Sequence, residues 1–178
     1  MPKAVFLDRD GTLNVDFEYI SDPEQIQLIE GVPEALRILR ERQYILFLVT
    51  NQSGIHRGYL TWEQLEQCQK RLLELIGLGH DLFQEICVAP EMPDEPSHYR
   101  KPSPHFILEM MEKYHLSPYD GYMVGDKESD ILSGINAGIQ SVWVETGQAI
   151  TPGIERYIME GNCIRARSLL DFVQQSLL

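Results

Sequence analysis

Cationic side chains are scarce in this chain of 178 residues, which has 15 Lys and Arg against 27 Asp and Glu and a formal net charge of −12. Such an excess of negative charge disfavours nucleic acids and anionic membrane surfaces as partners. A small anion can still bind, because a local cluster of cations is sufficient for it. Long apolar runs are also missing, since the longest, residues 44–49, is far shorter than a membrane span.

Cysteine is equally sparse. The three cysteines, Cys68, Cys87 and Cys163, are an odd number at wide spacing, so a disulfide framework is not expected. The N-terminus, Met1-Pro2-Lys3, shows no secretory signal, and together these features predict reduced thiols in a cytoplasmic protein. The length and the 43% hydrophobic content predict one globular domain over residues 1–178.

Short apolar runs alternate with amphipathic helical patterns. The apolar runs predict strands at 4–7, 44–49, 85–88, 122–124 and 141–144, and the helical patterns predict helices at 33–42, 61–76, 104–114, 128–137 and 168–176. Thr61 and Gln64 form a predicted capping box, and Gly138 can end the fourth helix. The proline-rich residues 89–104 predict a long loop. The alternation predicts an α/β fold, with a parallel sheet whose ligands bind beyond the carboxyl ends of its strands.

Polar residues follow these predicted strands. Asp8 and Asp10 come directly after the first strand, and two such close carboxylates favour a hard divalent cation such as Mg²⁺. The second strand leads into TNQSG at 50–54, a group of small donors that can hold phosphoryl oxygens through a hydroxyl and backbone N–H groups.

Further charges lie at two more strand ends. Arg100 and Lys101 precede the third helix, and Asp126 and Lys127 follow the fourth strand, with Asp130 one turn into the next helix. Each pattern alone has an ordinary explanation as a turn, a helix start or a solvated charge. Their occurrence together, in order, favours a shared site at one edge of the sheet.

This ordered set resembles the motifs of the haloacid dehalogenase superfamily of phosphohydrolases. The first motif corresponds to DRDGT at 8–12, the second to Thr50, the third to Lys101, and the fourth to Asp126 with Asp130. The resemblance extends over residues 4–145 and implies a Rossmann-like three-layer fold, Mg²⁺ dependence and a covalent aspartyl-phosphate intermediate.

The resemblance also implies a role for each motif residue. Asp8 is the expected nucleophile, and Asp10 the expected general acid and base. Mg²⁺ would be held by Asp8, the backbone carbonyl of Asp10, and Asp126. Thr50 and Lys101 would bind the phosphoryl oxygens. Asp130 is expected to orient Lys101 or a metal-bound water.

Further residues resemble one branch of this superfamily, the D-glycero-D-manno-heptose 1,7-bisphosphate 7-phosphatases, with histidinol-phosphate phosphatases sharing part of the pattern. They are Asp16 and Tyr19, the segment TNQSGI at 50–55, and the segments RKP at 100–102 and MVGDK at 123–127. Many members of this branch carry a Cys/His zinc loop, but here only Cys87 occupies a ligand position. Ala89, Ser97 and Tyr99 stand at the other three, and His98 is expected to be a solvated loop residue, so we expect no structural zinc.

The expected ligand is a small phosphorylated metabolite bound by an open site. Too few residues separate Asp8, Thr50 and Lys101 for a large cap domain, so specificity is expected from loops. The expected substrate-binding residues are Asp16, Tyr19, Asn51, Gln52, Ser53, Arg100 and Lys127. An open single-domain enzyme is expected to be a monomer.

The nearest alternative is a histidinol-phosphate phosphatase, and the others are another sugar-phosphate phosphatase, a polynucleotide 3′-phosphatase and a phospho-accepting receiver module. The negative charge disfavours the polynucleotide phosphatase. Asp10, two residues after Asp8, disfavours the receiver, which keeps its acid pair and its phospho-acceptor on different strands.

Overall fold

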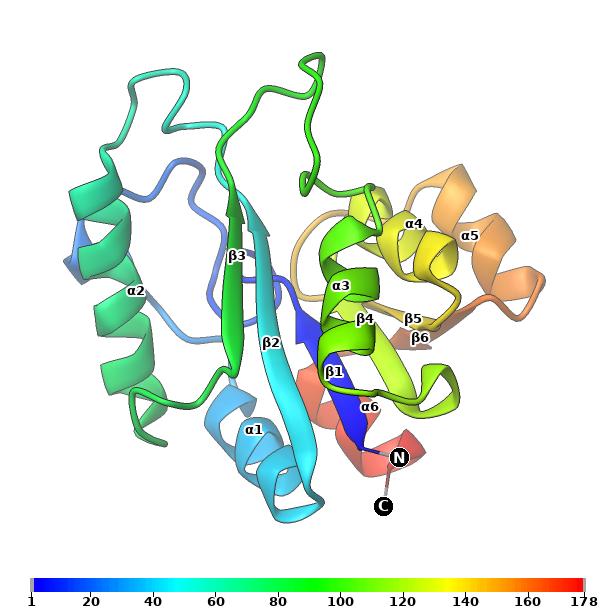
Figure 1. The fold of residues 1–178 in the computed structure, drawn as a ribbon. Helices are drawn as coiled ribbons and strands as arrows, with labels where there is room; N and C mark the ends of the chain where they lie inside the picture. The colour runs from blue at the N-terminus through cyan, green and yellow to red at the C-terminus, as the bar shows by residue number, and fades with distance from the viewer. Residues whose placement is uncertain (1, 178) are drawn as a thin grey trace.

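A six-stranded parallel sheet forms the centre of the computed structural model, which describes residues 2–177. The strands run in the order β3-β2-β1-β4-β5-β6 (Figure 1). Their bounds are β1 Lys3–Leu7, β2 Tyr44–Asn51, β3 Glu85–Ala89, β4 Gly121–Gly125, β5 Gln140–Val144 and β6 Cys163–Ala166. The predicted α/β fold with a parallel sheet is confirmed.

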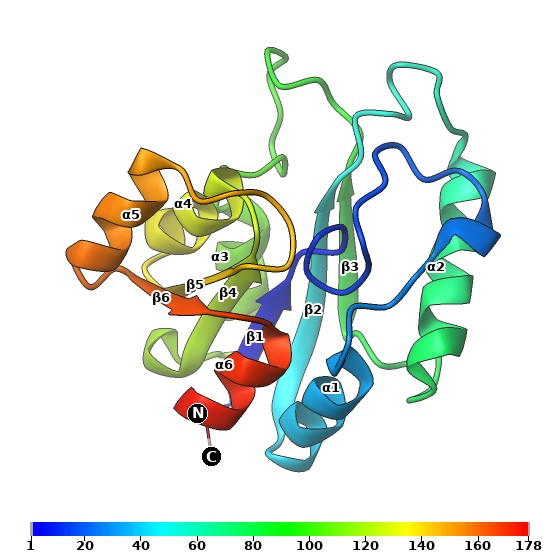
Figure 2. The same cartoon turned by 180° about the vertical axis from the view of Figure 1, so that it is seen from behind.

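Helices cover both faces of the sheet (Figures 1 and 2). One apolar cluster joins the sheet to α1 (Val32–Glu41), α2 (Trp62–Ile76) and α6 (Leu169–Ser176). A second cluster, on the other face, joins it to α3 (His105–Lys113) and α4 (Glu128–Ala137). The short 3₁₀ helices η1 (Pro23–Gln25) and η2 (Pro118–Asp120) lie in the connections. No helix in the described part of the chain has the length and apolar character to cross a membrane.

Local signals fixed several helix ends as predicted. The Thr61 side chain accepts a hydrogen bond from the Gln64 N–H, and the Gln64 side chain accepts one from the Thr61 N–H, which completes the capping box of α2. Gly138 ends α4 in the left-handed conformation that favours glycine. Helix α3 begins one residue later than predicted, because Pro104 is its N-cap residue and makes no side-chain cap.

Two elements were not predicted, namely α5 (Pro152–Met159) and β6. Strand β6 has four residues, lies at the sheet edge and includes the exposed Arg165, so it lacks the continuous apolar run of a buried strand. Helix α5 has a single fully buried residue, Ile154, which packs in a small cluster with Trp143 and Cys163. Tertiary packing at the sheet edge therefore determines both elements.

The topology brings distant segments to one edge. Strand β1 pairs with β2 on one side and with β4 on the other, so the chain leaves their carboxyl ends side by side. Between β3 and α3, residues 90–104 contain no helix or strand, as predicted for the proline-rich loop.

Candidate active site

The predicted motif residues meet at the carboxyl ends of β1, β2 and β4. Asp8 directly follows β1, Thr50 is the penultimate residue of β2, and Asp126 directly follows β4. Lys101 enters from the 90–104 loop, and Asp130 lies in the first turn of α4. All five are buried.

Lys101 is the buried cation at the centre of this group. Its Nζ lies 2.7 Å from Asp8 Oδ1 and 2.6 Å from Asp130 Oδ1, and it donates a 2.7 Å hydrogen bond to the Val49 carbonyl. Burial alone would lower the pKa of Lys101, but Asp130 and Asp8 outweigh that effect and hold the pKa above its ordinary value. Lys101 is therefore a charged ammonium held between two carboxylates.

Asp8, Asp126 and Asp130 form the one group within residues 2–177 that brings three metal-binding side chains together, with one oxygen of each within 4.8 Å of the others. Burial, and then the neighbouring Asp130, raise the pKa of Asp8 to about 7. Burial is also the main cause that raises the pKa of Asp126 to about 6. Asp126 Oδ1 is buried and has no hydrogen-bond partner. Crowded carboxylates with an unpaired oxygen fit a hard divalent cation.

Asp10 lies outside this acidic group, because three other side chains hold its carboxylate. Arg9 donates from Nε at 3.1 Å and from Nη2 at 2.9 Å, Asn14 from Nδ2 at 2.9 Å and Gln52 from Nε2 at 2.7 Å. Burial favours protonation, but Arg9 and these hydrogen bonds bring the pKa of Asp10 below its ordinary value. Arg9 and Asn14 were missed by sequence reasoning, although an arginine between two aspartates at a buried strand end is a signal for such a pair.

The residues after β2 connect the motifs. Gln52 Nε2 also donates to Thr50 Oγ1 at 2.8 Å, so one amide joins Thr50 to Asp10. The Asn51 amide makes two 3.1 Å hydrogen bonds with the backbone of Lys101, donating to its carbonyl and accepting from its N–H. Asn51, which was expected to contact substrate, therefore positions the Lys101 backbone in this structure.

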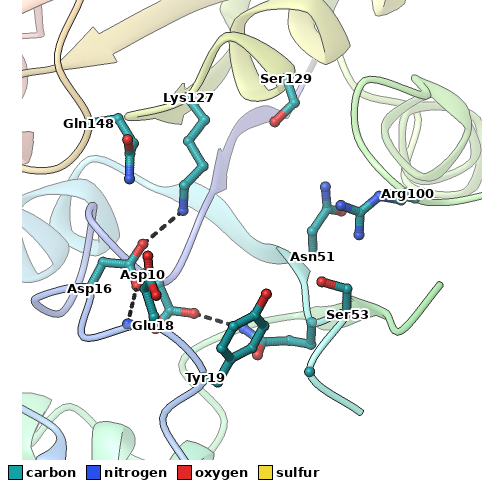
Figure 3. Close-up of a pocket in the computed structure, with 12 residues that line it drawn as sticks. Asp10, Asp16, Glu18, Tyr19, Asn51, Ser53, Arg100, Lys127, Ser129 and Gln148 are labelled. Carbon is teal, nitrogen blue, oxygen red and sulfur yellow. Dashed lines mark hydrogen bonds and ion pairs between the residues drawn. The ribbon is translucent and has the colours of Figure 1, made fainter. Parts of the chain in front are cut away.

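One cavity at this edge, of about 340 Å³, is lined by residues that include Asp126, Lys127 and Gln148, and two others contain the remaining motif residues and the predicted substrate-binding residues. The deeper of these two, of about 30 Å³, is lined by residues that include Asp8, Asp10, Thr50 and Lys101. The outer one, of about 280 Å³, is shown in Figure 3. All seven expected substrate-binding residues line the outer cavity, namely Asp16, Tyr19, Asn51, Gln52, Ser53, Arg100 and Lys127. Asp10 lines both the deeper and the outer cavity, whereas Asp126 lines neither. Gly54, the last residue of the TNQSG segment, also lines the outer cavity. Glu18, Ser129 and Gln148 line it as well, and no sequence motif indicated these three.

Lys127 crosses the outer cavity. Its Nζ lies 3.0 Å from Asp16 Oδ2 and 4.0 Å from Asp126 Oδ1 (Figure 3 shows the contact with Asp16). Burial alone would lower the pKa of Lys127. The nearby Asp8, Asp126 and Asp16 have the larger effect and raise the pKa above its ordinary value, so the side chain is charged. The residue thus places a cation between the acidic group and the outer cavity.

Tyr19 and Arg100 stand at the mouth of this cavity. Tyr19 adopts a positive φ of 46°, and its ring lies over Gly54, where a Cβ would be 2.6 Å from Tyr19 Cδ1. The Tyr59 ring packs against it, with the centroids 4.8 Å apart. Arg100 donates from Nη1 to the Glu91 carbonyl at 2.8 Å.

Cys87, the one residue at a ligand position of the zinc loop found in related phosphatases, is buried in β3. Burial raises the pKa of its thiol to about 12. The His98 ring packs against that of His105, with the centroids 4.2 Å apart. The absence of structural zinc stays a prediction.

Residues 12–144 match the family model described as haloacid dehalogenase-like hydrolase, a match that begins just after Asp8 and Asp10. The chain is 42% identical over 159 residues to the D-glycero-beta-D-manno-heptose-1,7-bisphosphate 7-phosphatase of Pasteurella multocida, which covers 85% of this chain and 86% of that protein. It is 34% identical over 170 residues to the enzyme of the same name from Escherichia coli K12, covering 85% and 84%.

A solved structure has a similar fold. It is the D,D-heptose 1,7-bisphosphate phosphatase of B. bronchiseptica, complexed with magnesium and phosphate. The TM-score is 0.84 at 24% identity, and the match covers 98% of both chains. At this level of identity the likeness extends to the fold.

Proposed function

The chain belongs to the haloacid dehalogenase-like hydrolases, and we propose that it removes the 7-phosphate of D-glycero-beta-D-manno-heptose 1,7-bisphosphate. Membership in this family and the named phosphatase relatives make the chain a phosphatase. The observation that supports this substrate is the sequence identity to the named relatives. It is 42% and 34% for the two described above, and each match covers about 85% of the chain.

Asp8 is the proposed nucleophile. Its buried carboxylate lines the deep cavity, where attack on phosphorus forms an acyl phosphate on Asp8 and expels the sugar alkoxide. Lys101 and Thr50 line the same cavity and are proposed to bind the phosphoryl oxygens, on which charge is concentrated in the transition state.

Asp10 is the proposed general acid and base. Asp10 lines both cavities, so it lies near the place where the phosphate proposed for the deep cavity would join the sugar proposed for the outer one. There it is proposed to protonate the leaving oxygen, a step that requires the bound substrate to raise the pKa that Arg9 and the hydrogen bonds lower, and then to take a proton from the water that hydrolyses the acyl phosphate.

Mg²⁺ is the proposed cofactor. Asp8, the backbone carbonyl of Asp10, and Asp126 would hold it, and the crowded carboxylates with the unpaired Asp126 Oδ1 fit such an ion. When bound, the ion reduces the repulsion between the nucleophilic carboxylate and the phosphate and orients the phosphoryl group. Asp130 is proposed to orient Lys101 through their 2.6 Å contact.

The outer cavity is proposed to hold the sugar and its second phosphate. Arg100 and Lys127 provide cations at opposite sides of this cavity, and Ser53 and Tyr19 provide hydroxyl groups (Figure 3). An arginine suits a phosphate through its planar set of donors. Arg100 is therefore the proposed contact for the 1-phosphate.

A phosphate-release assay with Mg²⁺ tests this proposal. We expect the beta anomer of the heptose bisphosphate to be turned over faster than the alpha anomer, histidinol phosphate and simple sugar monophosphates. Asp8→Asn should abolish release, and Arg100→Met should raise KM for the bisphosphate while leaving monophosphates little changed. Faster turnover of histidinol phosphate would refute the substrate, and near-normal turnover by Asp8→Asn would refute the nucleophile.

We also propose that residues 1–178 form a single domain, although residues 1 and 178 lie outside the described part, and that it acts as a monomer in the cytoplasm. Light scattering coupled to size-exclusion chromatography tests the oligomeric state. A mass of twice 20.5 kDa would contradict the monomer.

A further inference from the structure

The loop between β5 and α5, residues 145–151, contacts the site although none of the motifs lies in it. It runs past the carboxyl end of the sheet beside the segment that follows β1 (Figure 2). Thr146 Oγ1 donates a 2.6 Å hydrogen bond to the Gly11 carbonyl, and the Gln148 N–H donates a 2.8 Å hydrogen bond to Asp126 Oδ2. The loop therefore connects the segments that carry the first and fourth motifs.

Two glycines enclose the Asp126 carboxylate. A Cβ at Gly147 would lie 2.1 Å from Asp126 Oδ2, and a Cβ at Gly11 would lie 2.4 Å from the same oxygen. Gly11 also has a φ of +90°, which favours glycine for backbone reasons alone. Gly147 is not among the positive-φ glycines, so the close approach of Asp126 is the physical reason for glycine at this position.

The two carboxylate oxygens of Asp126 have different hydrogen-bond partners. Oδ2 is held by the loop, whereas Oδ1 is buried, has no hydrogen-bond partner and lies 4.0 Å from Lys127 Nζ. The indole Nε1–H of the buried Trp143 donates to the Asp126 carbonyl at 2.9 Å and fixes the backbone of the residue as well. Asp126 is therefore oriented from strand β5 and from the loop that follows it.

We propose that the 145–151 loop is a positioning segment that restricts Asp126 to one free oxygen and thereby sets affinity and selectivity for Mg²⁺, an inference that rests on the proposed metal of this site. Mg²⁺ binds few protein carboxylates and demands near-octahedral geometry, whereas Ca²⁺ accepts both oxygens of one carboxylate in a flexible shell. A carboxylate with one oxygen already bonded favours the smaller ion.

The test is a calorimetric titration of the full chain with MgCl₂ and, separately, with CaCl₂, in the absence of substrate. In Gly147→Ala the new methyl group must displace the Asp126 carboxylate. We expect Mg²⁺ affinity to fall by about 10-fold or more, the scale typical of groups that orient metal ligands. Ca²⁺ affinity should fall less, so that selectivity for Mg²⁺ declines.

Two further sets of variants separate this effect from loss of stability. Gly161→Ala is the matched control, because Gly161 has a φ of +78° and nothing within 4 Å of an added Cβ. It should lower the thermal unfolding midpoint and leave Mg²⁺ affinity unchanged. If Gly147→Ala does not fold, Thr146→Val removes the hydrogen bond to Gly11 and should weaken Mg²⁺ binding, and Thr146→Ser should restore it.

The outcomes distinguish the two levels of the proposal. Wild-type protein that binds no Mg²⁺ would overturn both the proposed cofactor and the role of the loop. Wild-type protein that binds Mg²⁺, together with Gly147→Ala or Thr146→Val protein that binds it equally well and with the same selectivity over Ca²⁺, would overturn the role of the loop alone.

Discussion

Asp8 should destabilise the metal-free protein, and replacement by asparagine should relieve this effect. Asp8 is 4% exposed, and burial followed by the neighbouring Asp130 raises its pKa from the ordinary 3.8 to about 7. Between these values the folded state binds a proton that the unfolded state has released, so the free energy of unfolding falls as the pH rises through this window. At about 1.4 kcal/mol per pKa unit, the loss reaches about 2 kcal/mol near pH 5.5 and about 4 kcal/mol near pH 8.5.

Asparagine keeps the shape of the side chain and removes its charge. In EDTA, the stability advantage of Asp8→Asn over wild type should therefore grow by about 2 kcal/mol between about pH 5.5 and about pH 8.5. Urea unfolding followed by circular dichroism at both pH values measures it. Mg²⁺ should reduce the advantage, because the ion binds the ionised wild-type carboxylate and stabilises the folded state.

A matched control is Asp94→Asn, which removes the same charge from an exposed loop residue and should change stability little at either pH. An advantage of Asp8→Asn that stayed constant or declined with rising pH would refute the reasoning. So would an equal change in Asp94→Asn, because the effect would then belong to the net charge.

Four further predictions follow from the contacts of the site. Gln52→Ala removes the hydrogen bonds to Asp10 and Thr50. The value of kcat for an alkyl phosphate should then fall about 10–100-fold more than kcat for p-nitrophenyl phosphate, because the nitrophenolate leaving group needs no general acid. Equal losses in steady-state assays would contradict this. Lys101→Met leaves Asp8 and Asp130 without their cation and should lower the free energy of unfolding by about 3–5 kcal/mol in EDTA near pH 8, measured in urea. Lys127→Met breaks a partly exposed pair with Asp16, so stability should change by less than about 1 kcal/mol while KM rises; a larger stability loss with unchanged KM would assign Lys127 a structural role. Elemental analysis of the purified protein should find no stoichiometric zinc, and one tightly bound zinc per chain would overturn that expectation.

Residues that follow strands could be placed from sequence. Asp8, Thr50 and Asp126 come at the ends of apolar runs, and a parallel sheet necessarily brings such positions to one edge. The helix ends at Thr61 and Gly138 were equally accessible, because capping depends on residues only a few positions apart.

Contacts through the interior could not be placed in this way. Asn14 is fully buried and its side chain donates to Asp10, yet nothing in the sequence around it indicates this partner. The amide of Asn51 is bonded to the Lys101 backbone, a partner 50 positions away that only the folded loop supplies. Strand β6 and helix α5 depend on packing at the sheet edge and left no local pattern. The hydrogen bond from the Gln148 N–H in the β5–α5 loop to Asp126 likewise joins residues far apart in the sequence.

The contact between Thr146 and Gly11 joins residues 135 positions apart, and that between Lys101 and Asp8 joins residues 93 positions apart. Neither contact can form in an N-terminal segment that ends after β2, even if β1 and β2 pair there. Contacts of such long range form slowly because long loops must close first. During refolding, recovery of turnover should therefore lag behind recovery of helix content. Enzymatic activity would report the formation of these two long-range contacts, whereas helix content would report earlier, more local folding.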